Sequence, residues 1–376
     1  MGCKIAIGGD FYVGIREVER IDDSVCSSLR KVLDEVDFKI INLEAPIINL
    51  GNPANKFGPN LKMTKTVIPI IKKLKIDLLT LANNHILDHG TVGLEETLMN
   101  LDKASVQHIG AATKVSEMNR PKVFEIKGMQ IGVVNVAENE FIQIDDVGAN
   151  AIDFPSNLKT ILELKGRTDK IIVIVHGGNE THLYPSVRFK ETLRFFIDAG
   201  ADAVIAHHTH CFNGYEYYKD KPIAFGLGNF LFNVPGQNID WSLGVIAVLK
   251  LEKNNPIQIE FRPFLQNFEG LMFTDTLPQN VRDYFESRSD ELDRLVSDDD
   301  ELRNRFDAFM DSKKKQYNHF IQPYSNVWLH RLFSKGMLPS PWKNGKKQLL
   351  LNLIRCESHR DILIKLLDNE NSHPSI

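Results

Sequence analysis

"AVIAHHTHCF", residues 203–212, is a short apolar run that leads directly into three histidines. Side chains of an extended segment point alternately to the two faces of a sheet. His208 and His210 are therefore expected on one face, and His207 on the other, where a structural role is favoured for it unless the strand has already ended. Two imidazoles on one face can bind one metal ion or two neighbouring ions. The alternative is that each ring caps a turn or meets solvent. If the histidines bind a metal, its remaining ligands must come from elsewhere in the chain.

Outward from this stretch, apolar strand-like runs alternate with segments of helical spacing. The expected strands are 4–10, 38–44, 76–85, 106–109, 170–180, 201–208, 243–252 and 257–266, with hairpins at 122–136 and 215–230. The expected helices are 24–36, 64–75, 91–104 and 186–199. Continuous apolar strands between helices predict an α/β layered fold, and the antiparallel hairpins indicate a mixed sheet or two stacked sheets.

The character of the chain changes after about residue 270. Residues 283–320 are charged and helical in period, and 346–367 form a second amphipathic pattern. The sequence therefore predicts a main domain over 1–270 and a helical C-terminal extension over 271–376. Dimerisation, a lid over the site and docking of a partner all remain open as roles for the extension. The run Lys313–Lys314–Lys315 is interpreted as a solvated helix end.

Composition limits the class of protein. The 376 residues are 43% hydrophobic and 25% charged, with a formal net charge of −4, as in an ordinary globular protein without a basic field for nucleic acid. The four cysteines form no CxxC pair and are read as free thiols of a reducing compartment. No signal peptide or transmembrane run of about 18 apolar residues is recognised. A cytoplasmic location is therefore expected.

Polar clusters follow the expected strands at the points where the strands end. They are Asp10, Glu44, "ANNHILDHG" (82–90), "HGGNETH" (176–182), "HHTH" (207–210) and "GLGNF" (226–230). Ligand sites of α/β sheets form at the carboxyl ends of strands. Carboxylate, amide and imidazole groups without thiolate suit one or two divalent ions of Mn, Fe or Zn in a hydrolytic site. Two ions about 3.5–4 Å apart would polarise a phosphoryl group and activate a water.

The ordered series "GGDF", "NLEAP", "ANNHILDHG", "HGGNE", "HHTH" and "GLGNF" resembles the CapA family, the poly-gamma-glutamate capsule-synthesis proteins. Those proteins are similar in fold to calcineurin-like metallophosphoesterases, and the resemblance covers about residues 3–235. It implies a layered metallophosphoesterase-like fold with mixed β-sheets flanked by helices. The C-terminal hundred or so residues resemble no family.

The resemblance also implies roles for single residues. His85 looks like the catalytic histidine, and Asp88 is expected to orient it or to fix the turn before Gly90. The metal ligands implied are Asp10, Glu44, Asn84, His176, His208 and His210. The residues expected to contact substrate are Glu180, His182, Arg188 and Asn229, although a solvated loop and helix face is an equal alternative for His182 and Arg188.

Two positions depart from the phosphoesterase pattern. Tyr12 stands where those enzymes place a first-strand histidine, and Glu44 stands where they place a bridging aspartate. The expectation is therefore either a weak second ion position or a single bound metal. The expected function is a metal-dependent hydrolase of the CapA type that acts on a phosphoester or a related bond of an anionic small molecule or polymer. The alternatives are a non-catalytic accessory subunit of a poly-gamma-glutamate or capsule synthesis complex, and amide-bond hydrolysis on glutamyl polymers.

Overall fold

The computed structural model describes residues 2–49, 51–54, 58–138, 147–232, 238–267, 272–274, 277–320 and 327–339, with 346, 347, 350 and 354. The second amphipathic pattern expected at 346–367 lies almost wholly outside the described residues. The chain divides into two compact units, Met1–Asp307 and Ala308–Ile376.

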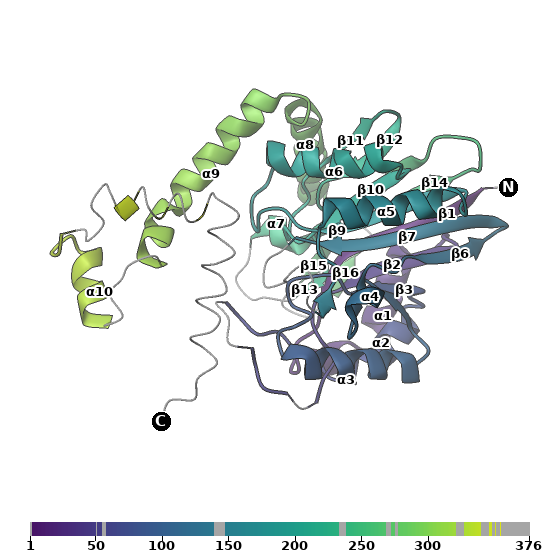
Figure 1. The fold of residues 1–376 in the computed structure, drawn as a ribbon, viewed down its shortest axis with the longest axis horizontal. Coiled ribbons are helices and arrows are strands. Elements are labelled where there is room, and N and C mark those ends of the chain that lie inside the picture. The colour runs from purple at the N-terminus through teal and green to yellow at the C-terminus, as the bar shows by residue number, and fades with distance from the viewer. Residues whose placement is uncertain are drawn as a thin grey trace. The chain divides into compact units, whose positions relative to one another are not determined.

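The first unit contains two large sheets (Figure 1). The eight-stranded sheet has β1 (Cys3–Tyr12) at its centre, parallel to β2 and antiparallel to β14. Its path is β16 (Met272–Thr274), β15 (Gln258–Asn267), β14 (Leu243–Leu251), β1, β2 (Phe38–Leu43), β3 (Leu78–Thr80) and β4 (Gln107–Ile109), and β13 (Asn229–Phe232) also pairs with β1.

The six-stranded sheet is also mixed. Its order is β11 (Tyr215–Tyr218), β12 (Lys221–Ala224), β10 (Ala203–His207), β9 (Lys170–His176), β7 (Met129–Ala137) and β6 (Lys122–Ile126). The four strands β7, β9, β10 and β12 run parallel, and β6 and β11 close the two edges as antiparallel hairpin arms. A short ladder joins β5 (Ala111–Ala112) and β8 (Gly148–Ala149).

Alternating side chains place the two sheets face to face. In β1, Ile5 and Ile7 join the core between the sheets, whereas Ala6 belongs to the core on the opposite face. In β9, Ile172 and Ile174 likewise face the first sheet. Each fully buried isoleucine contributes about 1.5–3 kcal/mol to folding.

Helices cover the two outer faces and complete the layers. Residues of α1 (Asp23–Val32), α2 (Val67–Lys73) and α3 (Gly90–Lys103) share a core with the outer face of the first sheet. Residues of α5 (Phe154–Lys165) and α6 (Val187–Ala199) share one with the second. The expected layered α/β fold, with mixed sheets flanked by helices, is therefore confirmed.

Some elements differ from the expectation. Helix α5 was not anticipated, although Leu158, Ile161 and Leu164 have helical spacing. The hairpin of β11 and β12 forms as expected, but its continuation, β13, leaves for the other sheet. The strand expected over 76–85 is confined to Leu78–Thr80. The remaining short helical elements are η1 (Val18–Arg20), α4 (Val115–Met118), α7 (Ile239–Ser242) and α10 (Val327–Ser334).

The charged segment 283–320 lies within two helices, α8 (Gln279–Leu295) and α9 (Asp299–Phe320). Leu292 of α8 is fully buried in a small core with Phe212 and Val245. The Lys190 ammonium of α6 donates to the Val296 carbonyl, 2.9 Å away, and pairs with Asp299. These contacts explain why the first compact unit extends past residue 270 to Asp307.

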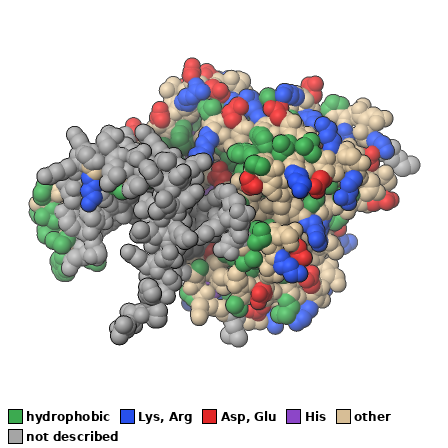
Figure 2. All heavy atoms as spheres, viewed as in Figure 1, with side chains coloured by type: hydrophobic (Ala, Val, Ile, Leu, Met, Phe, Trp, Pro, Cys, Tyr) green, Lys and Arg blue, Asp and Glu red, His purple; other side chains and the backbone are tan. Residues whose placement is uncertain are grey.

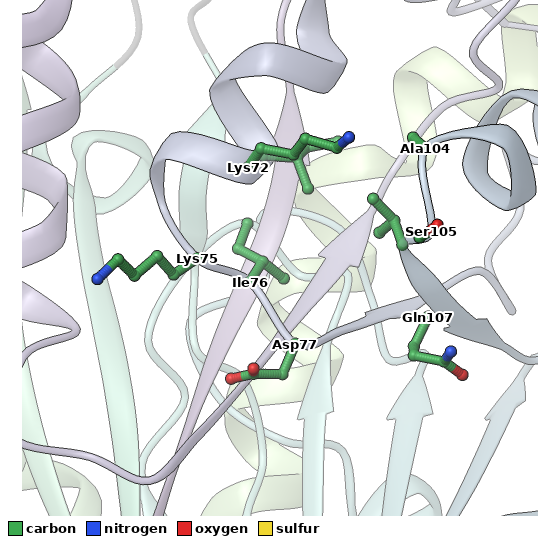
Figure 3. Close-up of a pocket in the computed structure, with 9 residues that line it drawn as sticks. Lys72, Lys75, Ile76, Asp77, Ala104, Ser105 and Gln107 are labelled. Atoms are coloured by element: carbon green, nitrogen blue, oxygen red, sulfur yellow. The ribbon is translucent and has the colours of Figure 1, made fainter.

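A shallow pocket of about 340 Å³ lies where β3 and β4 begin (Figure 3). Lys72, Lys75 and Asp77 line it together with Ser105 and Gln107. It lies at the amino ends of these two strands. On the face of the first unit shown in Figure 2, basic and acidic side chains are interspersed.

Candidate metal centre

The opposite, carboxyl ends of the parallel strands gather a buried polar cluster from both sheets. Asp10 lies near the end of β1, and Glu44 directly follows β2. His176 and His207 are the last residues of β9 and β10. All four residues are at most 1% exposed. Because ionisable groups are costly to bury without partners, this cluster requires a specific explanation.

A β-bulge directs Asp10 into the cluster. In the pairing of β1 with β2, Gly8 lies opposite Ile41 and Asp10 lies opposite Asn42, so that Gly9 is the extra residue. Without the bulge, Asp10 would share the outward face of Ala6 and Gly8. The inserted residue reverses the alternation, and Asp10 instead faces the second sheet.

The Asp10 carboxylate is the hub of the contacts. Its Oδ1 lies 3.0 Å from His207 Nδ1 and accepts a hydrogen bond from the Asn42 amide at 2.9 Å. Its Oδ2 accepts from the backbone N–H of His208 at 3.1 Å and lies 3.4 Å from His210 Nδ1. Both sheets therefore hold this one side chain.

His176 links the cluster to the other expected ligands. Its Nδ1 lies 2.9 Å from His207 Nδ1, and its Nε2 lies 3.0 Å from Asn84 Oδ1. The same Nε2 is 3.7 Å from Glu44 Oε1. Asn42 also donates to the second carboxylate oxygen of Glu44.

The two histidines beyond the end of β10 reach the cluster through an unusual backbone. His208 and His210 have positive φ values of 110° and 59°. The His208 ring lies 4.5 Å from the His176 ring, and His210 Nδ1 lies 2.9 Å from Asn229 Oδ1. The structure thus brings His176, His208 and His210 together.

The expectation that His207 faces away is wrong. His207 shares the parity of Ala203 and Ile205, which lie in the core between the sheets. It therefore faces the first sheet and meets Asp10. The alternation argument failed because the extended conformation ends at His207, and the turn that follows brings His208 and His210 round to the same cluster.

Within the part of the chain that the structure describes, three groups of donor atoms are compact enough to surround a cation. Within each group, one donor atom per residue lies within 4.8 Å of the others. The groups are Asp10, His176 and His207; Glu44, His176 and His208; and Asp10, Glu44 and His210.

One buried atom in the cluster tests the fit to a metal. Among the described residues, Glu44 Oε1 has no hydrogen-bond partner, although it is inaccessible to solvent and lies 3.7 Å from His176 Nε2. A buried polar atom without a partner is costly, and a coordinated cation would satisfy it. The mixed oxygen and imidazole donors suit Mn, Fe or Zn. The donor set therefore fits a divalent metal.

The pKa values of the two acidic side chains in the cluster are shifted in opposite directions. Burial alone would raise the pKa of Asp10, but the hydrogen bond and charge of His207 lower it well below its ordinary value. Burial and the charge of Asp10 raise the pKa of Glu44 well above its ordinary value.

The pKa values of the imidazoles in the cluster are also shifted in different directions. Burial lowers the pKa of His176 well below its usual range and that of His208 to about 4. For His210, burial alone would lower the pKa, but the hydrogen bond to Asp10 together with the charges of Asp10 and Glu180 raises it. Neutral imidazoles at His176 and His208 are in the protonation state that ligates metals.

His85 and Asp88 form a pair beside the cluster. His85 Nδ1 lies 2.7 Å from Asp88 Oδ2, which also accepts a hydrogen bond from the backbone N–H of Leu61. The charge of His85 further lowers the pKa of His176 and of His208, which reflects how near the ring lies to the cluster. Asn83 holds the loop by donating to the Leu43 carbonyl at 2.8 Å.

The residues expected to contact substrate lie in three different environments. Glu180 and Arg188 are exposed, and the charge of Glu180 contributes to the raised pKa of Glu44. Asn229 is fully buried, and its amide contacts His210 and the Trp241 carbonyl. His182 is buried away from the donor groups, with its ring between those of Tyr184 and Phe306.

The position of His182 predicts a pH dependence of stability. Burial, together with the charge of Arg288, lowers the pKa of His182 from 6.5 to about 4. Between pH 6.5 and about pH 4, His182 binds a proton in the unfolded chain but not in the folded chain. The free energy of unfolding should therefore fall on acidification through this window, by at most about 1.4 kcal/mol per pH unit.

Urea unfolding of the His182→Phe protein from pH 7 to pH 4 tests this expectation. The substitution keeps an aromatic ring between Tyr184 and Phe306 but cannot bind a proton. The variant should show a shallower loss of stability than the unaltered protein. Parallel curves for the two proteins would contradict a buried neutral His182.

Two residues that contact the cluster were not identified from the sequence. Asn42 bridges Asp10 and Glu44, and its only signal was a polar residue inside an apolar strand. Trp241 packs against His210 with ring centroids 4.4 Å apart and the ring planes tilted by 36°, but it comes from a separate element, α7. Cys211 adjoins His210 in the sequence, but burial raises the pKa of its thiol to about 12, which disfavours the thiolate that binds metals.

These features define a layered α/β protein with a buried carboxylate and imidazole centre at the carboxyl ends of its parallel strands. A model of the bacterial capsule synthesis protein family, PGA_cap, matches residues 4–234. The chain belongs to this family. Of the helices that the structure describes, none has the length and apolar character needed to cross a bilayer.

The chain is similar to several capsule and polyglutamate proteins. It is 27% identical over 241 residues to the PGA biosynthesis protein CapA of Bacillus subtilis (strain 168), covering 60% of this chain and 62% of that protein. It is 26% identical over 242 residues to the capsule biosynthesis protein CapA of Bacillus anthracis, covering 60% and 58%. A probable polyglutamine synthesis accessory protein of Mycobacterium tuberculosis is 28% identical over 215 residues, covering 53% and 57%. The chain thus matches about three-fifths of the length of these relatives.

Among solved structures, a hypothetical protein from Thermus thermophilus is 15% identical, with a TM-score of 0.45, covering 70% of this chain and 99% of that one. The 5'-nucleotidase from Candida albicans SC5314 is 13% identical, with a TM-score of 0.43, covering 77% of this chain and 57% of that one.

Proposed function

We propose that this protein is a metal-dependent hydrolase of the CapA type, acting on a phosphoester or a related bond in capsule or extracellular-polymer biosynthesis. The observation that carries the proposal is the convergence of Asp10, Glu44, His176 and His208 from four strand ends at one buried point. Membership of the capsule synthesis family supports the link to an extracellular polymer.

The residues that would hold the metal are the expected set with His207 added. They are Asp10, Glu44, Asn84, His176, His207, His208 and His210. A bound Mn, Fe or Zn ion would supply Lewis-acid polarisation and an acidic water.

The chain's own residues have defined tasks in such a site. Asp88 accepts the hydrogen bond at His85 Nδ1 and so fixes the orientation and tautomer of the ring. His85 can then hold or move a proton at Nε2, beside the developing charge of a leaving group. Asn229 and Trp241 restrain the His210 ring on two sides. An anionic small molecule or polymer is the proposed substrate.

His85→Ala separates catalysis from metal binding. Protein purified without chelator should contain a divalent metal and hydrolyse an aryl phosphate, a phosphodiester or a glutamyl polymer in the presence of Mn, Fe or Zn. The variant should keep its metal and lose about 100-fold or more of the activity, the usual contribution of a general acid. Absence of hydrolysis of all three substrate classes by the metal-loaded, unaltered protein would refute the proposal.

A second candidate is a non-catalytic accessory subunit of a poly-gamma-glutamate or capsule synthesis complex. Tyr12, which stands at the position of a phosphoesterase histidine, favours it. The Mycobacterium tuberculosis relative, a probable polyglutamine synthesis accessory protein, favours it as well. Retention of the His85→Ala protein by a synthase complex, with polymer production unchanged in cells, would favour this candidate over the hydrolase.

A further inference from the structure

Helix α10 (Val327–Ser334), in the second compact unit, carries large apolar side chains on its surface. Trp328 is 72% exposed, Leu329 41% and Leu332 40%. Trp328 and Leu332 are four residues apart, as are Leu329 and the half-buried Phe333, so the four side chains form one continuous arc. Hydrophobic side chains are visible on this unit at the left of Figure 2. A contiguous exposed patch of this kind marks an interaction site.

Outside the arc the helix is mixed in character. Arg331 and Ser334 occupy the other face together with Val327, which is 63% exposed, and Lys335 follows directly after the helix; all four are exposed. The Arg331 guanidinium lies 5.6 Å from the centre of the Trp328 ring, at one border of the apolar arc. Met337, 66% exposed, extends the apolar surface beyond the last turn.

The sequence around α10 is strongly positively charged. Residues 312–356 contain nine lysines and arginines and no aspartate or glutamate, although the chain as a whole has a formal net charge of −4. The nine are Lys313, Lys314, Lys315, Arg331, Lys335, Lys343, Lys346, Lys347 and Arg355. Such a segment is attracted to a negatively charged surface.

We propose that helix α10, with Arg331 and the adjoining Lys335, binds the surface of an anionic lipid bilayer, with its apolar arc entering the boundary between headgroups and acyl chains. Tryptophan and leucine on one face, with arginine and lysine on the other, is the composition of helices that lie in this boundary. Basic charge alone would suit nucleic acid equally well. The exposed arc of Trp328, Leu329 and Leu332 favours a bilayer, because only the bilayer offers an apolar layer beneath its charges. This inference does not depend on the proposed hydrolase activity.

Sedimentation of the full-length protein with vesicles tests the proposal. In about 50 mM salt, the protein should sediment with vesicles of phosphatidylcholine and phosphatidylglycerol mixed 7:3. It should bind vesicles of phosphatidylcholine alone at least about tenfold more weakly, because several basic residues contribute to the attraction. Binding to the mixed vesicles should also weaken at about 500 mM salt, where charges are screened beyond roughly 4 Å.

Matched variants distinguish vesicle binding through the apolar arc from non-specific binding through any exposed apolar side chain. Trp328→Ser with Leu332→Ser should weaken binding to the mixed vesicles about tenfold or more, since two buried apolar side chains are lost. Val92→Ser with Leu162→Ser is the control, because these side chains are 64% and 52% exposed on helices of the first unit. The control should bind like the unaltered protein, and circular dichroism should show that both variants are folded.

Three results would overturn the proposal. The first is no sedimentation with the mixed vesicles at low salt. The second is unchanged binding of the Trp328→Ser and Leu332→Ser protein, which would indicate attraction by charge alone, as to nucleic acid. The third is a lipid-free dimer that the same two substitutions dissociate, which would assign the arc to a second copy of the chain.

Discussion

The His208→Ala and His210→Ala double variant is expected to lose its bound divalent metal and to retain at most about one-hundredth of any metal-dependent hydrolysis. The reason is geometric, since each histidine belongs to a separate compact donor group with Glu44 or Asp10. Removing both leaves buried carboxylates with fewer partners for a cation, and loss of even supporting residues costs about 10–100-fold at metal sites. Elemental analysis of protein purified without chelator measures the effect without relying on activity.

His108→Ala is the matched control for the double variant. His108 lies in β4 and pairs with Asp102 at 3.1 Å, outside the donor groups. The metal content and activity of the His108→Ala protein should equal those of the unaltered protein. Full metal occupancy in the His208→Ala and His210→Ala protein would show that the cation, if bound, lies elsewhere.

Gly9→Ala should destabilise the protein by roughly 3 kcal/mol and disturb the metal centre at the same time. A Cβ atom at Gly9 would lie 1.8 Å from the carbonyl oxygen of Gly228. Relief of that clash must push apart two backbone segments that are joined by the hydrogen bond from the Asp10 N–H to the same carbonyl. Since Gly9 is the bulge residue that turns Asp10 inward, its displacement also moves the hub of the cluster.

Urea unfolding and metal analysis of the folded fraction measure the two effects of Gly9→Ala together. Gly166→Ala is the control, because Gly166 has a φ of −89° and a Cβ there would meet no atom within 4 Å. That variant should be as stable as the unaltered protein or slightly more so, because alanine reduces the entropy of the unfolded chain. Equal stabilities for Gly9→Ala and the unaltered protein would contradict the close approach of β1 to Gly228.

Local pattern was enough to predict the class of fold and the edge of the sheet at which the polar groups gather. Strands such as 170–176 are continuous apolar runs because both of their faces are buried, and this shows in composition alone. The polar residues that end these strands, Asp10, His176 and the histidines after Ala206, were visible for the same reason. The carboxyl ends of parallel strands must meet at one edge, so their convergence followed from topology.

The tertiary structure alone decided which atoms meet. The bulge at Gly9 reverses the direction of Asp10, and the positive φ of His208 ends the alternation that was used to place His207. Both features depend on a partner strand far away in the sequence. His182 shows the same limit: its neighbours in sequence include Glu180, whose charge acts on the cluster, yet its own ring packs against Phe306. Periodicity describes a regular backbone, whereas these groups are placed where the backbone departs from regularity under long-range contacts.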